Sequence, residues 1–176
     1  MFYLVISIII ISIIGTISHF LYDISNHNKI IGLFSAVNES TWEHIKIALT
    51  PTLLWGLIDG LIFGDDPNYF TAKFISLLVI IILMPLLFYG YIKITKKDIP
   101  IIDILIFYIV IISSQLSFYY IINMNPINGF ISYLSGIGIF LIFGGYMIHT
   151  LMPAKSLLFK DPLTNKYGYN GHNKKN

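Results

Sequence analysis

Long apolar runs alternate with short polar segments along the chain as far as residue 152. A helix needs about 20 mostly apolar residues to cross about 30 Å of hydrocarbon, and five of these runs are long enough. We expect membrane-spanning helices at residues 2–22, 41–63, 70–93, 99–123 and 128–152. The segments between them contain turn-forming sequences such as "FGDDPN" and "NMNPING". The pattern therefore predicts an all-α integral membrane bundle of about five transmembrane helices.

A polar tail follows the last predicted span. We divide the chain into a transmembrane helical domain, residues 1–154, and this tail, residues 155–176. After Tyr169 the tail consists mainly of Asn, Gly and Lys, which is typical of disordered segments. Residues 24–40 are too short and too interrupted to span a membrane, but their apolar side chains could form a short interfacial helix.

Composition supports a membrane location and excludes several kinds of function. Of the 176 residues, 56% are hydrophobic and only 11% are charged, which is too little charge for a soluble surface. The chain has no cysteine, so disulfides and thiolate chemistry are excluded. The net charge of +2 is too small to indicate a nucleic-acid partner. The expected partners are the lipid bilayer and a small-molecule or lipid ligand.

The distribution of lysine, the only basic residue type apart from histidine, predicts the orientation of the bundle. Lysines gather after the third span and in the tail, whereas Asp65 and Asp66 follow the second span. The connector after the fourth span has no charge. Because lysine-rich segments stay in the cytoplasm, five spans place the N-terminus outside and the C-terminus inside. The first connector then also faces the cytoplasm.

Residues suited to metal binding gather at this first connector. His19 and Asp23 are four residues apart, so they share one helix face near the end of the first span. The stretch "VNESTWEH" opens the second span and adds Glu39, Glu43 and His44. Imidazoles with carboxylates suit zinc, iron or manganese. The sequence thus predicts a divalent-metal site of His19, Asp23, Glu39 and His44, with Glu43 and His44 as candidate catalytic groups.

The same stretch also has a structural interpretation. Ser40 and Glu43 match a capping box, in which the serine side chain accepts from the N–H of Glu43 and the glutamate reaches back to the serine N–H. Lys46, three residues after Glu43, is placed to form an ion pair with it. A cap does not explain His19, Asp23 or His44, so the metal site and the cap both stay open.

Polar residues deeper in the spans raise a transport interpretation. Asp59 lies near the outer end of the second predicted span, and Gln115 lies near the middle of the fourth. Ionisable groups at such depth are costly unless paired or hydrated, and they often mark ion pathways. The alternative is that Gln115 and its neighbouring serines hydrogen-bond between helices while Asp59 reaches the outer surface.

Two motifs resemble those of a family of small bacterial multi-pass membrane proteins classed as a domain of unknown function. One is "VNESTWEH"; the other, "DPLTNKYG", contains Asp161, Pro162, Thr164, Tyr167 and Gly168. The resemblance implies a shared fold in a bacterial cytoplasmic (inner) membrane, and it implies no activity. Because both motifs are cytoplasmic in the predicted topology, we expect the tail to fold back and bring Asp161, Thr164 and Tyr167 near Glu43 and His44.

Three classes of function stay open on the sequence. A metal-dependent membrane hydrolase would act on a lipid-like substrate at the cluster of histidines and carboxylates. A small transporter or proton-coupled permease would depend on Asp59 and Gln115. A structural or partner-binding protein would use the first motif as a cap and a docking surface. The oligomeric state is open as well.

Overall fold

The computed structural model describes residues 1–172, and long helices make up most of this part of the chain. They are α1 (Phe2–Ile24), α3 (Thr41–Phe63), α4 (Tyr69–Thr95), α5 (Pro100–Ile122) and α6 (Gly129–Leu151). Each begins and ends within two residues of a predicted span. All five are long and apolar enough to cross a membrane. The prediction of an all-α bundle with five such helices is confirmed.

Three short helices lie outside the spans. The expected interfacial helix is α2 (Lys29–Gly32), and the tail contains the 3-10 helices η1 (Leu157–Phe159) and η2 (Gly168–Gly171). The prediction of disorder directly after Tyr169 is therefore wrong as far as His172, because η2 continues to Gly171 and His172 contacts the first connector. The rest of the segment predicted to be disordered, residues 173–176, lies outside the described residues.

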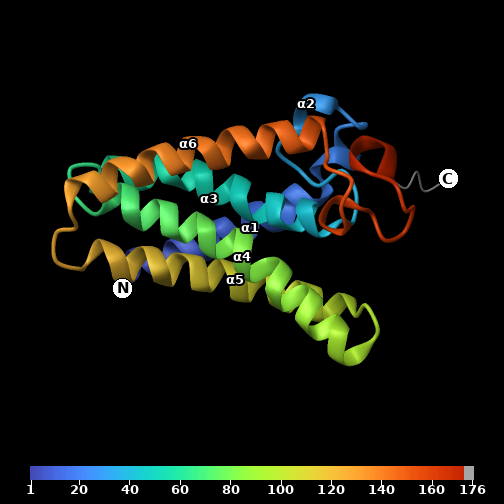
Figure 1. Cartoon of the computed structure of the whole chain (residues 1–176), viewed down its shortest axis with the longest axis horizontal. Coiled ribbons are helices and arrows are strands. Elements are labelled where there is room, and N and C mark those ends of the chain that lie inside the picture. The colour runs from blue at the N-terminus through green and yellow to red at the C-terminus, as the bar shows by residue number, and fades with distance from the viewer. Residues whose placement is uncertain (173–176) are drawn as a thin grey trace.

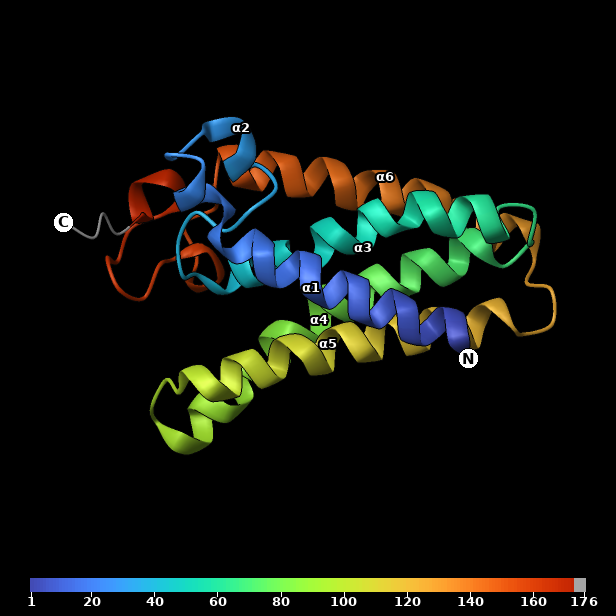
Figure 2. The same ribbon diagram turned by 180° about the vertical axis from the view of Figure 1, so that it is seen from behind.

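The bundle is elongated, and its connectors divide between two ends (Figures 1 and 2). The N-terminus, the α3–α4 loop and the α5–α6 loop lie at one end. The other end carries the α1–α3 connector with α2, the α4–α5 turn and the whole C-terminal tail, and we call it the tail end. This division is the one that five passes require. The assignment of the tail end to the cytoplasm stays a prediction from the lysines.

Helix α3 occupies the middle of the bundle and contacts α1, α4 and α5. Its neighbours approach closely where small residues allow it: a Cβ atom on Gly15 of α1 would lie 2.7 Å from the carbonyl oxygen of Ile47. Polar side chains point inward and bond between helices, as Ser114 of α5 does to the carbonyl of Ser76 in α4 at 2.9 Å. The outward faces are strongly apolar, as expected for helices solvated by lipid tails.

Helices α4 and α5 form a hairpin that diverges from the other helices toward the tail end (Figures 1 and 2). Helix α4 contains Pro85 within its length, and Pro51 lies within α3. Proline removes one helical hydrogen bond and kinks a helix. The tip of this hairpin thus stands apart from the helices that lie next to the tail (Figures 1 and 2).

Candidate metal site at the tail end of the bundle

A buried ion pair organises the first connector. Lys46 Nζ lies 2.5 Å from Glu43 Oε2, and both side chains are almost fully buried. The same carboxylate oxygen accepts from the N–H of Val37 at 3.0 Å, and Lys46 donates to the carbonyl of Gly32 at 2.8 Å. Charged hydrogen bonds of this kind are strong, and they fix the connector against α3. Glu43 is thereby engaged inside the protein, which gives it a structural role and removes the reason to assign it as a catalytic base.

The predicted capping box is wrong in its bonds, although Ser40 does occupy the N-cap position of α3. The Ser40 hydroxyl has no hydrogen-bond partner among the described residues, and the Ser40 N–H donates to the Asn38 side chain at 2.8 Å. Glu43 reaches back to Val37 rather than to Ser40. The buried cation of Lys46 holds the Glu43 carboxylate on that side of the helix, so it cannot serve the cap.

The tail folds back over the first connector, as expected from the two motifs, although its bonds go to Asn38 and Glu39 rather than to Glu43 and His44. Asp161 is buried, and its Oδ1 accepts from the Glu39 N–H at 3.0 Å. Its Oδ2 accepts from both the N–H and the hydroxyl of Thr164, each at 2.6 Å. Asn38 donates to the Gly168 carbonyl at 2.9 Å. These bonds join the start of α3 directly to the tail motif.

The remaining motif residues shape the docked tail. Tyr167 packs against the main core and forms an isolated antiparallel β-bridge with Lys160. Pro162 lines the space next to the tail. Gly168 has φ of +53°, a left-handed conformation that glycine adopts without strain, and a Cβ atom there would lie 3.0 Å from Pro153 Cγ. The motif thus contributes the turn at Gly168, part of the lining of the adjacent space at Pro162 and the core contact of Tyr167.

A tyrosine beyond the motif adds a further bond between the tail and the connector. The hydroxyl of Tyr169 donates to the Lys29 carbonyl at 2.8 Å. Burial, with Tyr22 and Glu43 nearby, raises the pKa of Tyr169 to about 12. Because the pKa is raised, the protonated donor persists throughout the neutral and moderately basic range.

Three of the four predicted metal ligands meet at one point. Nε2 of His19 lies 3.5 Å from Oε2 of Glu39, and Nε2 of His44 lies 3.8 Å from the same oxygen. One ligand atom from each residue lies within 4.8 Å of the other two. Ligand atoms bound tetrahedrally to zinc at about 2.0–2.1 Å stand about 3.3 Å apart, so these atoms would draw together by up to about 1.5 Å to enclose a cation.

The hydrogen bonding of His44 favours metal binding. Its Nδ1 lies 3.1 Å from the Ser40 carbonyl, which can only accept, so Nδ1 carries the proton. A neutral His44 then presents the lone pair of Nε2 to His19 and Glu39. Metal-binding histidines are oriented in this way by a carbonyl or carboxylate on the other nitrogen. Asp161 supports the third ligand in turn, since it holds the Glu39 backbone.

Asp23, the fourth predicted ligand, lies in a different cluster, so the structure corrects its assignment. Its Oδ1 is 3.4 Å from His27 Nε2 and 3.3 Å from His172 Nε2. Asp23 and His19 share a face of α1, but the chain turns directly after α1 and brings His27 back onto Asp23. His27 and His172 were not predicted as ligands because no spacing connects the first connector to the end of the tail.

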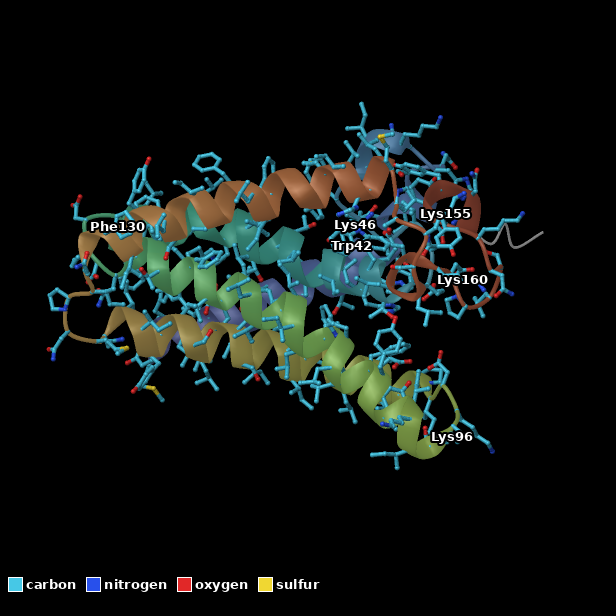
Figure 3. The ribbon with its side chains drawn as sticks, viewed as in Figure 1. Trp42, Lys46, Lys96, Phe130, Lys155 and Lys160 are labelled. Atoms are coloured by element: carbon cyan, nitrogen blue, oxygen red, sulfur yellow. The ribbon has the colours of Figure 1, made fainter. Side chains whose placement is uncertain are left out.

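A cleft of about 310 Å³ adjoins the metal-binding cluster. It lies between the tail and the tip of the α4–α5 hairpin, and Glu39 forms part of its wall. Lys96, Lys97 and Lys160 also line it. Figure 3 shows Lys160 on the tail and Lys96 on the tip of the hairpin, with Trp42 and Lys46 in the bundle next to the tail. The cleft therefore combines a predicted metal ligand with several cationic groups.

The transport candidates Asp59 and Gln115 both lie inside the bundle. Asp59 is fully buried, lies 2.6 Å from Lys73 Nζ of α4 and accepts from the hydroxyl of Tyr3. The expectation that Asp59 reaches the outer surface is therefore wrong, because a cation from the next helix neutralises it inside the bundle. Gln115 is also buried, and its Nε2 has no hydrogen-bond partner among the described residues. The Asp59–Lys73 pair joins α3 to α4, and a transport role for Asp59 and Gln115 stays a prediction.

The comparison with known families agrees with the resemblance carried by the two motifs. A family model matches residues 2–169, and both motifs lie within this range. No curated protein and no solved structure matches the chain. The five apolar helices are those of a multi-pass membrane protein. Because the match covers nearly the whole chain, the protein belongs to a family of unknown function, DUF6512.

Proposed function

We propose that this protein binds a divalent cation, namely zinc, iron or manganese, between His19, Glu39 and His44. The proposal rests on three ligand atoms, one each from α1, the first connector and α3, that lie within 4.8 Å of one another. The lysines predict that the site lies at the cytoplasmic face of the membrane, and the resemblance of the two motifs implies a bacterial inner membrane. In this orientation metal would reach the site from the cytoplasm.

The arrangement fits a catalytic metal better than a structural one. Two histidines and one glutamate supply three ligands, which leaves a coordination position for water or substrate. A cation held by these three residues would supply an activated water and a Lewis acid for an ester or phosphoester oxygen. We propose hydrolysis of a lipid-like substrate, whose head would lie in the lysine-lined cleft beside Glu39 and whose tails would stay in the bilayer. Water adds to the ester or phosphoester, and the alcohol leaves.

The metal content of the purified, detergent-solubilised protein tests the proposal. We expect His19→Ala and His44→Ala each to lose one metal equivalent per chain relative to the wild type. His149→Phe is a matched control, because His149 packs against the rings of Trp42 and Phe159 and lies outside the cluster. All variants are compared at equal monodispersity. A wild-type protein that binds no metal after incubation with each of the three ions would refute the site, and a site that binds metal without esterase or phosphoesterase activity would refute the hydrolase.

A further inference from the structure

We propose a second metal-binding site, formed by Asp23, His27 and His172, that fastens the C-terminal tail to α1. The three residues come from the last turn of α1, the first connector and the segment after η2. They share no residue with the cluster of His19, Glu39 and His44, so this inference does not depend on the function proposed above.

The ligand atoms converge as a metal site requires. Both His27 Nε2 and His172 Nε2 face Asp23 Oδ1, at 3.4 Å and 3.3 Å, and all three atoms lie within 4.8 Å of one another. The two imidazole centroids are 4.4 Å apart. Two imidazoles and a carboxylate suit zinc and neighbouring late first-row divalent cations. The carboxylate is largely exposed, so water can complete the coordination.

The hydrogen bonding of His172 leaves its Nε2 to face the Asp23 carboxylate. Its Nδ1 lies 3.1 Å from the Val37 carbonyl, which only accepts, so Nδ1 carries the proton. A neutral His172 then directs the lone pair of Nε2 at a carboxylate oxygen, which is repulsive. One divalent cation would be bound by the Nε2 lone pairs of His27 and His172 and by the Asp23 carboxylate together.

The backbone of the connector is shaped to present His27. Asn26 and His27 have φ of 55° and 62°, so two consecutive residues other than glycine adopt the left-handed conformation. The ring of Tyr22 packs against both histidines, with centroids 5.2 Å away in each case. A strained conformation persists only where its surroundings hold it, and here it delivers an imidazole to Asp23 and to the tail.

A cation at this position would hold the tail against α1, and we call the site of Asp23, His27 and His172 the clip. His172 follows η2, whose Tyr169 bonds to the connector, and the same tail holds the Glu39 backbone through Asp161. Metal bound by the docked form and not by the undocked form stabilises docking. Removal of the metal would therefore loosen the tail.

Zinc stoichiometry in the full-length, detergent-solubilised protein tests the clip. The informative variants are His172→Gln and His27→Asn, since asparagine tolerates the left-handed backbone that alanine would strain. We expect two equivalents of zinc per wild-type chain, one in each of these variants and one in His44→Ala. Hydrogen exchange of tail amides provides a second readout: zinc should slow it at least tenfold in the His44→Ala background and leave it unchanged once His172→Gln is added.

The outcomes separate the two sites. One equivalent that survives His172→Gln and His27→Asn but is lost in His44→Ala would overturn the clip and keep the first site. One equivalent with the opposite pattern would keep the clip and refute the first site. If His172→Gln fails to fold, His27→Asn and the zinc dependence of tail exchange in the His44→Ala protein decide the question, and zinc-independent exchange there would overturn the clip.

Discussion

Replacing Asp161 with alanine removes the carboxylate that joins the tail to the first connector. In the wild type this buried side chain accepts from the N–H groups of Glu39 and Thr164 and from the Thr164 hydroxyl. The hydroxyl has an alternative acceptor, because the Gly171 carbonyl lies 3.0 Å from it. The two backbone donors would lose their acceptor, so the cost of Asp161→Ala falls mainly on them.

The expected magnitude follows from these two donors. A hydrogen bond to a charged acceptor contributes about 1.5–3 kcal/mol, and water entering the vacated space recovers part of that loss. We therefore expect the free energy of tail docking to fall by about 2–4 kcal/mol in Asp161→Ala. Asp161→Asn keeps an acceptor for one N–H but turns its own NH₂ group toward the other. It should therefore also lower the free energy of tail docking, by less than Asp161→Ala does.

Hydrogen exchange measures this change, because docked amides exchange through local opening. A loss of 2–4 kcal/mol corresponds to exchange about 30- to 700-fold faster for the amides of Glu39 and Thr164. Asp65→Asn is the matched control, since Asp65 is exposed in the α3–α4 loop at the opposite end of the bundle. If Asp161→Ala left these amides as protected as in the control, the docking role of Asp161 would be refuted.

Three further substitutions test the buried pairs and the tail turn. Lys46→Met leaves the Glu43 carboxylate buried without its cation, so it should lower the free energy of unfolding by about 3–5 kcal/mol. Adding Glu43→Gln should recover part of this loss. An unchanged unfolding midpoint in detergent would contradict the stabilising role of the Glu43–Lys46 pair. Asp59→Asn should cost a similar amount by stranding Lys73, and a variant of normal stability that has lost a proton-coupled flux would instead support transport. Gly168→Ala should weaken tail docking by about 1–2 kcal/mol, seen as faster tail exchange, because its φ is +53° and a Cβ would meet Pro153. Gly144→Ala, where a Cβ meets no atom within 4 Å, is its control.

The sequence predicted the five long helices well because their signal is physically simple. An apolar run of about 20 residues must become a helix in a bilayer, where backbone groups find no water to bond. Turn residues and prolines then limited the ends of α3 and α5 to within a residue of those expected. The docking of the tail was also predictable, although only through the topology that placed both motifs at one end.

The partners of the buried charges could not be predicted in the same way. Helical spacing relates residues within one helix, so it paired Glu43 with Lys46 correctly but gave no partner for Asp59. Lys73 lies on the next helix, and its meeting with Asp59 depends on how α3 and α4 pack and in which register. The split of Asp23 from His19 has a related cause, since the left-handed turn at Asn26 and His27 redirects the connector.

The second candidate metal site includes His172 of the tail, and the first includes Glu39, whose N–H donates to Asp161 of the tail, so metal binding and docking should stabilise each other. A ligand that binds only the docked form stabilises it by about 2.7 kcal/mol when its free concentration is a hundred times Kd. This is close to the expected loss in Asp161→Ala, a change that leaves all six proposed ligands in place. Zinc at such a concentration should therefore restore most of the exchange protection that this variant loses. If zinc binds the variant but leaves its tail exchange unchanged, the tail docks independently of metal, and neither site can act through it.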